Sequence, residues 1–202
     1  MGVGAGTDFL QWVRAGAYAT GVDLTPEAIA NTQARLELYG LRAQELLVAD
    51  AENLPFPNNS FDLVYSWGVI HHSPDTPRCL AEIVRVARPG GAIKIMVYNR
   101  YSFFALYQWV RSALLKGKPF QSLSKVLFNH QESLGTKAYT KKEMLCMIAP
   151  HPVVVVKIDT TATSHDLLYY RRAVRWITYP IVSIVGWWHA GWFMTIELRK
   201  NI

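Results

Sequence analysis

Residues 2–24 read GVGAGTDFLQWVRAGAYATGVDL, and this stretch decides the fold. A glycine-rich turn at Gly2 to Gly6 leads into a helix pattern over Thr7 to Ala15, and a strand pattern follows over Tyr18 to Leu24. A glycine turn that opens a helix beside a short apolar strand is typical of doubly wound α/β proteins, whose parallel strands alternate with helices. The stretch therefore predicts an α/β fold with a mostly parallel sheet.

The alternation continues through the first half of the chain. Residues 25–27 (TPE) supply an N-cap, a proline at the first helical position and an acidic residue, which predicts a helix that ends near Gly40. Residues 89–91 (PGG) are expected to stop a second helix and to precede a strand. The further expected elements are strands at 44–49, 61–66 and 92–98 and a helix at 75–87.

The second half has a different character. Aromatic residues predict a helix over 103–110, and the less periodic stretch from Lys116 to Lys137 is expected to form a lid or cap. Thr140 and Glu143 have the spacing of a capping box, and strands are expected at 153–158 and 192–198. Residues 176–194 contain no Asp, Glu, Lys or Arg, but proline, glycine and histidine interrupt them. They are expected to form an apolar helix and a buried strand rather than a membrane span.

Length and composition indicate one folded domain over residues 1–202. The chain is 50% hydrophobic and 18% charged, which excludes long disordered or low-complexity regions. Cys79 and Cys146 stand alone, so neither a disulfide framework nor a metal site is expected. The net charge of +6 comes from cations spread along the chain, which does not indicate nucleic-acid binding. The N-terminus lacks the features of a signal peptide, and we expect a reducing, cytoplasmic location.

Residues that can carry chemistry gather at the expected carboxyl ends of the first strands. The backbone of Gly2 to Gly6 can approach a ligand closely, and Asp23 can accept hydrogen bonds from both hydroxyls of a ribose. Asp50 ends the next strand, so the glycine turn and both carboxylates are expected in one crevice. The alternative for Asp23 is a structural role, capping the turn into Thr25. Thr7 stands where the dinucleotide fingerprint has its third glycine, which disfavours NAD.

The order of these motifs resembles the class I S-adenosylmethionine-dependent methyltransferases, particularly the group that includes the quinone-biosynthesis methyltransferases. The resemblance rests on GVGAGTDF at 2–9, GVDL at 21–24, VADAENLPFPNNSFDLVYSWGVIHH at 48–72 and RVARPGGAIKIMVY at 85–98. It implies a Rossmann-like fold, with residues 1–99 as the cofactor-binding half and 100–202 as an acceptor-binding cap region with C-terminal strands. It also implies S-adenosyl-L-methionine as the cofactor of a methyl transfer to a small hydrophobic or aromatic acceptor.

The resemblance further assigns residues to the cofactor. The glycine turn would meet the methionine part, Asp23 the ribose hydroxyls, and Asp50 the adenine amine. The aromatic face of Trp67 would favour the positive sulfonium, and core packing of Trp67 is an equal alternative. The cofactor-binding residues implied in this way are Gly2, Val3, Gly4, Gly6, Asp23, Leu24, Asp50, Ala51, Ser66 and Trp67.

Two histidines and a strand end are expected on the acceptor side. Methyl transfer is an in-line displacement, so a base is needed only where the acceptor must lose a proton. His72 is the best placed catalytic base, and the alternative is that one histidine packs while the other is solvated or caps the helix near Asp75. His71, Tyr98 and Asn99 are expected to contact the acceptor, with a half-buried, purely structural tyrosine as the alternative for Tyr98.

The C-terminal region bears on partners. Basic and aromatic residues mix between Tyr169 and Trp188, where a lid over a hydrophobic acceptor is expected and peripheral membrane contact is a second expectation. The expected partner is therefore a small-molecule acceptor, without nucleic acid. The alternative function is a non-catalytic binding module that keeps the same fold.

The resemblance has one departure. Family members place a hydrophobic strand ahead of the glycine turn, whereas this sequence begins at the turn. The first strand is therefore expected to be missing, which would leave the edges of two neighbouring strands unpaired. A missed upstream start, a fragment and a degraded paralogue are three explanations. We expect a missing N-terminal segment, because the cofactor positions all hold suitable residues.

Overall fold

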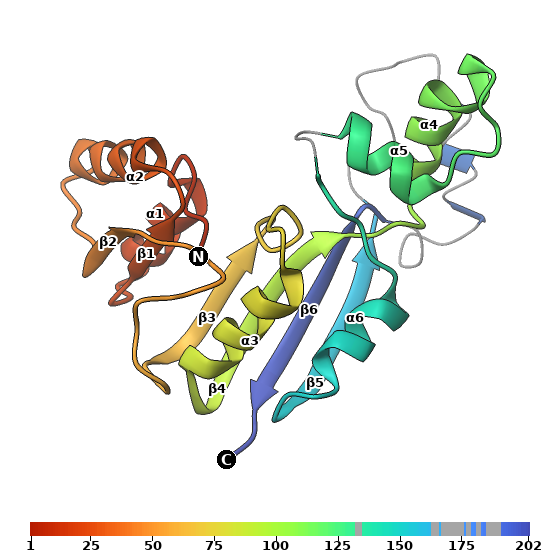
Figure 1. Cartoon of the computed structure of the whole chain (residues 1–202). Coiled ribbons are helices and arrows are strands. Elements are labelled where there is room, and N and C mark those ends of the chain that lie inside the picture. Colours follow the sequence, from red (N-terminus) through yellow and green to blue (C-terminus); the bar gives the residue numbers. More distant parts are fainter. Residues whose placement is uncertain (132–134, 163–165, 167–175, 177–178, 181–182, 185–190) are drawn as a thin grey trace.

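The structure is a computed structural model of the 202-residue chain, and it describes all residues except 132–134, 163–165, 167–175, 177–178, 181–182 and 185–190 (Figure 1). The described helices are α1 (Thr7–Arg14), α2 (Pro26–Leu38), α3 (Thr76–Val86), α4 (Phe103–Ser112), the short 3-10 helix η1 (Leu114–Lys116), α5 (Leu123–His130) and α6 (Lys141–Ile148). The described strands are β1 (Thr20–Asp23), β2 (Glu45–Val48), β3 (Phe61–Trp67), β4 (Ala87–Tyr98), β5 (Val153–Thr161) and β6 (Phe193–Lys200).

Local signals in the sequence place several helix starts correctly. The side chain of Thr25 accepts a hydrogen bond from the Ala28 amide, with proline in the first turn of α2. Asp75 caps α3 in the same way, accepting from the Arg78 amide at 3.0 Å. Both halves of the capping box between Thr140 and Glu143 are formed at the start of α6.

The strands form two sheets, and the doubly wound, Rossmann-like prediction is confirmed. β1 pairs with β2 in parallel, and the second sheet has the order β3-β4-β6-β5. β3 and β4 are parallel, but β6 runs antiparallel to both of its neighbours, so the pairing is mixed. Among the described residues no sheet pairing joins β1 to β3.

One expected boundary is wrong, and one stretch without a predicted element contains a helix. Residues 89–91 do not stop a helix, because α3 already ends at Val86 and the PGG segment lies inside β4, next to a register shift against β3. The stretch from Lys116 to Lys137 contains the helix α5, whose start is capped by Ser122. Short helices with an irregular apolar pattern owe their stability to packing, and α5 packs against α4.

Helices α3 and α6 lie over one face of the four-stranded sheet, while α4 and α5 form a separate lobe beyond the carboxyl end of β4 (Figure 1). The main core lies between α3 and β4, where Leu80, Ile83, Ile93 and Ile95 are almost fully buried. Both cysteines are free thiols. No described helix is long and apolar enough to cross a membrane, and most of the apolar segment 176–194 lies outside the described residues.

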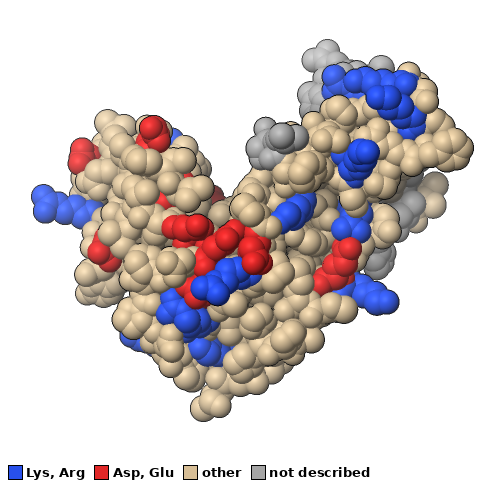
Figure 2. All heavy atoms as spheres, in the orientation of Figure 1, with Lys and Arg blue, Asp and Glu red and all other residues tan. Residues whose placement is uncertain are grey.

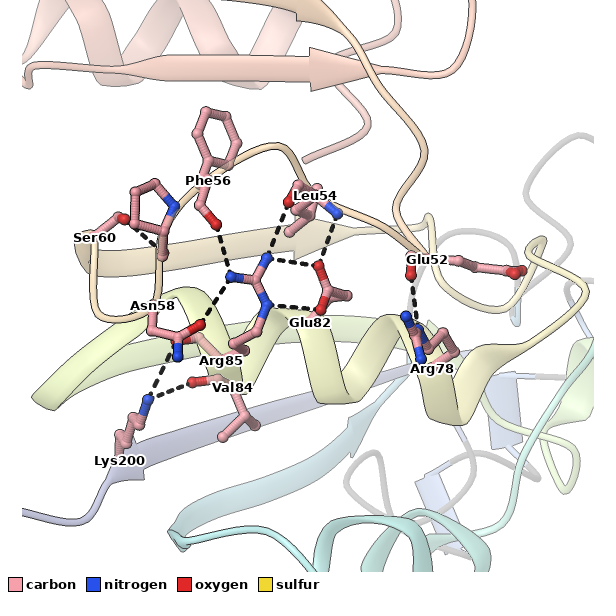
Figure 3. A network of polar contacts seen from close by, with 11 residues as sticks. Glu52, Leu54, Phe56, Asn58, Ser60, Arg78, Glu82, Val84, Arg85 and Lys200 are labelled. Atoms are coloured by element: carbon pink, nitrogen blue, oxygen red, sulfur yellow. Dashed lines mark hydrogen bonds and ion pairs between the residues drawn. The ribbon is translucent and has the colours of Figure 1, made fainter.

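An arginine on α3 holds the loop between β2 and β3 against the core. Arg85 forms a two-pronged ion pair with Glu82 and also donates to the carbonyls of Leu54 and Phe56 (Figure 3). Glu82 in turn accepts from the Leu54 amide at 2.7 Å. The pair with Arg85 lowers the pKa of the buried Glu82 carboxyl, which keeps it charged. This network fixes the loop that begins at Asp50.

Removing Arg85 is expected to destabilise the fold. In Arg85→Ala the Glu82 carboxylate stays buried without its cation, so we expect a loss of about 3 kcal/mol in the free energy of unfolding. The measurement is urea denaturation. Arg88→Ala is the matched control, because its partner Asp62 is exposed, and it should cost less than about 1 kcal/mol. Equal losses in the two variants would contradict the role given to the network.

Candidate functional site

The glycine turn and the first strand are joined at the carboxyl edge, meaning the edge where β1 to β4 end. The amides of Gly2 and Val3 both donate to the carbonyl of Val22, at 2.8 and 3.2 Å. The Gly4 amide donates to the Asp23 carboxylate at 2.9 Å. The predicted convergence of the glycine turn and Asp23 is therefore present in the structure.

The shape of the turn requires glycine. Gly4 and Gly6 have φ angles of 52° and 76°, in the region that favours glycine. A side chain on Gly6 would meet the Thr32 hydroxyl at 2.9 Å, and that hydroxyl donates to the Gly4 carbonyl. On Gly4, in contrast, nothing lies within 4 Å of where a Cβ would be. The turn is thus held by α2 on one side and open on the other.

The two carboxylates differ in how firmly they are held. Asp23 also accepts from the amide and hydroxyl of Thr25, at 3.2 and 3.3 Å, so both the binding and the turn-capping interpretations have support in its contacts. Asp50 is exposed and accepts a hydrogen bond from the Glu52 amide at 2.9 Å. Leu24 and Ala51 follow these two residues, and Leu24 is exposed.

The end of β3 presents a buried hydroxyl and an exposed indole. Ser66 is fully buried, and its hydroxyl has no hydrogen-bond partner among the described residues. Trp67 is 37% exposed and stacks on Tyr65, with ring centroids 5.6 Å apart. The alternative that Trp67 is a core residue is therefore wrong. Adjacent residues of a strand point to opposite faces, so the buried Ser66 hydroxyl and the exposed Trp67 indole lie on different sides of β3.

The two histidines that follow β3 lie in different environments. His71 is fully buried, 4.1 Å from the Tyr98 ring between centroids, and Tyr98 stacks on Trp192. His72 is half-buried, with its Nδ1 atom 3.2 Å from the Thr136 hydroxyl. The alternative in which one histidine packs therefore describes His71.

Tyr98 and Asn99 lie at the carboxyl end of β4 but are both buried. The side-chain amide of Asn99 donates to the Gly191 carbonyl at 2.9 Å, and its oxygen accepts from the Tyr101 amide. Asn99 thus ties β4 to the start of β6. Direct contact of Asn99 with an acceptor, as predicted, would require these two bonds to open.

The burial of His71 has a consequence for stability. Burial, with a smaller contribution from the neighbouring His72, lowers the pKa of His71 to about 3, so the folded protein holds His71 neutral. The unfolded chain takes up a proton near pH 6.5, so lowering the pH below this value favours unfolding, by about 2 kcal/mol near pH 5. Urea denaturation near pH 5 and at a pH above 6.5 should show this loss of stability in the wild type and not in His71→Leu. If the stability of the wild type and of His71→Leu changes with pH in the same way, the role given to His71 is wrong. The control is His130→Gln, which removes an exposed histidine and should keep the pH dependence of the wild type.

A cavity of about 750 Å³ lies between the facing edges of β1 and β3. Thr20 lines it from β1, and Phe61, Leu63 and Tyr65 line it from β3. At the carboxyl end, Met1 closes it, because its nitrogen donates to the Tyr65 carbonyl at 2.9 Å. Of the predicted cofactor residues only Gly2, Val3 and Trp67 contribute to this cavity, so it lies beside the carboxyl edge rather than at it.

Two residues near the site could not be found from the sequence, Tyr65 and Asp166. Tyr65 donates to Asp8 at 3.0 Å and stacks on Trp67, linking α1 to β3. Asp166 is buried and accepts from the Trp192 amide at 2.9 Å. Neither belongs to a short motif, and a strand tyrosine or an isolated aspartate carries no local signal of such a contact.

Known sequences resemble the first half of the chain. Residues 1–95 match the family described as methyltransferase domain. A phthiotriol/phenolphthiotriol dimycocerosates methyltransferase of Mycobacterium leprae is 48% identical over 90 residues, which are 45% of this chain and 32% of the relative. Phthiotriol/phenolphthiotriol dimycocerosates methyltransferase 1 of Mycobacterium ulcerans is 38% identical over 134 residues, which are 66% of this chain and 47% of the relative. The chain spans less than half the length of these curated relatives.

Solved structures support the fold. A SAM-dependent methyltransferase of Methanosarcina mazei superposes with a TM-score of 0.68 at 18% identity, over 100% of this chain and 90% of that chain. The cyclase SpnF has a TM-score of 0.65 at 16% identity, over 100% and 73%. A fold shared with a cyclase does not by itself fix the reaction. Residues 1–95 therefore match a methyltransferase domain, and the chain as described shares its Rossmann-like fold with a solved S-adenosylmethionine-dependent methyltransferase.

Proposed function

We propose that the chain contributes the S-adenosylmethionine site and part of the acceptor site of a methyltransferase for a small hydrophobic or aromatic acceptor. The observation that carries this proposal is the bond from the Gly4 amide to the Asp23 carboxylate at the carboxyl edge, beside the end of β3. Ligands of doubly wound folds bind at that edge. The named function of the mycobacterial relatives supports the same activity.

The residues present fit the cofactor. Gly4 leaves open space in front of the turn, where the methionine part would lie. Asp23 already accepts three hydrogen bonds, and the longest, 3.3 Å from the Thr25 hydroxyl, is the one that a ribose hydroxyl would replace. Asp50 remains open for the adenine amine, and the exposed face of Trp67 would stabilise a positive sulfonium. The bound cofactor supplies an electrophilic methyl group.

The acceptor side is aromatic. Tyr98 lies between His71 and Trp192, and Phe104 packs on Trp192 with ring centroids 5.0 Å apart. These rings are buried, and we propose that a hydrophobic acceptor binds against this aromatic cluster. The half-buried His72 would take the proton from an acceptor hydroxyl as its oxygen attacks the methyl carbon and the carbon–sulfur bond breaks. The products are the methylated acceptor and S-adenosylhomocysteine.

The sheet has room for one more strand. Met1 donates to β3 at Tyr65 and Gly2 donates to β1 at Val22, so a segment joined to Met1 would continue between both strands and parallel to them. We expect this segment to be apolar, because it would be buried on both faces. We also propose that the chain belongs to the group that includes the quinone-biosynthesis methyltransferases and that its first strand is missing.

Activity tests the proposal directly. His72→Ala should lower kcat about a hundredfold for an acceptor hydroxyl and leave the affinity for S-adenosylhomocysteine unchanged. Thr136→Val is the matched variant, since it removes only the hydroxyl beside His72 and should act more weakly. Binding without turnover of any acceptor would favour a non-catalytic binding module. We call the chain extended ahead of Met1 by five Val or Ile residues the strand-completed chain. Absence of S-adenosylhomocysteine binding in that chain would overturn the proposed function.

A further inference from the structure

The lobe formed by α4, η1 and α5 ends in a tip that exposes large apolar side chains. We define the tip by the residues Leu114, Leu115, Lys116, Lys118, Phe120 and Lys125. Phe120 is fully exposed and Leu115 is 76% exposed. Single exposed apolar residues are ordinary, but several gathered at one end of a lobe mark an interaction surface.

The tip is held in place by hydrogen bonds. The Trp109 indole donates to the Gln121 carbonyl at 2.7 Å, and the Lys118 amide donates to the Ala113 carbonyl at 2.9 Å. Gly117 makes the turn between them, with φ 69°. Phe120 and Leu115 therefore lie on a loop that is already held by hydrogen bonds. Little conformational entropy is lost when these side chains contact a partner.

Charge around the tip has a single sign. Residues 101–131 contain four Lys or Arg residues and no Asp or Glu. Within the described part of the chain, Lys116, Lys118 and Lys125 take part in no ion pair. Figure 2 shows Lys and Arg atoms gathered on this lobe, while the Asp and Glu atoms in view lie over the rest of the molecule.

We propose that the tip docks on an anionic lipid surface, with Phe120 and Leu115 inserted at the headgroup level and the three lysines facing lipid phosphates. Apolar side chains ringed by lysine match such a surface, because the apolar part is buried and each cation meets a negative headgroup. Exposed Leu114 and Leu115 favour lipid over nucleic acid, whose bases stack on aromatic rather than aliphatic side chains. The tip residues lie outside the stretch of sequence from Tyr169 to Trp188 considered above.

Docking at the tip would also fix how the aromatic cluster of the acceptor side is oriented relative to the membrane. α4 runs from the tip back to Phe104, which packs on Trp192 beside Tyr98. A hydrophobic acceptor that leaves the membrane would therefore meet the protein on the side of the aromatic cluster. The docking itself needs neither cofactor nor methyl transfer, so it stands or falls separately from the proposed function.

Co-sedimentation with vesicles tests the proposal. The full chain should pellet with vesicles of equal parts phosphatidylglycerol and phosphatidylcholine, and hardly with pure phosphatidylcholine. The triple variant K116Q/K118Q/K125Q should bind about a hundredfold more weakly, at roughly fivefold for each lysine. The double variant L115S/F120S should keep only weak binding that high salt removes. All these side chains are exposed, and unchanged thermal unfolding should show that both variants are folded.

The control variant removes the same charge elsewhere. R42Q/K141Q/K142Q changes three cations outside the tip and should bind like the wild type. If this control loses as much binding as the tip variant, net charge alone is responsible and the proposal is wrong. If the tip variants bind like the wild type, another segment makes the contact and the proposal is equally wrong. Binding of single-stranded RNA without vesicle binding would also overturn it.

Discussion

Asp23→Ala should remove most of the affinity of the strand-completed chain for S-adenosylhomocysteine, lowering the association constant about a hundredfold. The carboxylate accepts a hydrogen bond from the Gly4 amide at 2.9 Å and is proposed to accept hydrogen bonds from the ribose hydroxyls. Its loss therefore removes charge-assisted hydrogen bonds and loosens the glycine turn. Such bonds contribute about 3 kcal/mol together. Calorimetric titration gives the affinity directly.

Two matched variants make the Asp23 result interpretable. Asp50→Ala should weaken binding only about fivefold, because an exposed carboxylate with one internal bond gains less from a ligand. Asp62→Ala removes an exposed carboxylate near the opposite end of β3 and should leave the affinity unchanged. Full affinity in Asp23→Ala would assign Asp23 to turn capping alone and remove the ribose assignment.

Filling the space between β1 and β3 should produce the second large effect. We expect a chain with five Val or Ile residues placed ahead of Met1 to gain about 3 kcal/mol in the free energy of unfolding, the small surplus of apolar burial over lost chain entropy. The melting temperature should rise by roughly 6 to 12 °C. Five residues suffice because β3 offers five residues from Phe61 to Tyr65.

The control for this effect keeps the length and changes the chemistry. Five Gly and Ser residues ahead of Met1 cannot bury apolar surface, and they should leave the melting temperature unchanged. If the Val and Ile segment stabilises the chain no more than the Gly and Ser segment, the space does not take a strand. The cavity would then need another occupant or another explanation.

Much of the first half could be predicted from the sequence. The glycine turn, the cap at Thr25 and the alternation of strands and helices are local signals, and α1, α2 and β3 all begin within a residue or so of their predicted starts. The convergence of Asp23 with the glycine turn also follows from strand order, because parallel strands end at the same edge.

The errors have physical causes. The PGG segment was expected to end a helix, but pairing with β3 draws it into β4, since tertiary pairing overrides local turn propensity. The helix α5 lies inside the expected cap, but its bounds depend on packing against α4, which a local pattern does not carry. The environments of His71 and Trp67 depend on residues distant in sequence, so one proved buried and the other exposed.

The role of the cavity was also beyond the sequence. The sequence predicts an unpaired edge, but the hydrogen bonds from Met1 and Gly2 to β3 and β1 are what define where a further strand would run. The same holds for the tip, where the exposure of Phe120 depends on the Trp109 bond that pins its loop.

Titration of S-adenosylhomocysteine into the strand-completed chain tests the central claim most directly. We expect saturable binding of one molecule per chain, competed by S-adenosylmethionine and largely lost in Asp23→Ala of the same chain. NAD should give no heat. Absence of binding in a folded, strand-completed chain would contradict the claim that the carboxyl edge is a cofactor site.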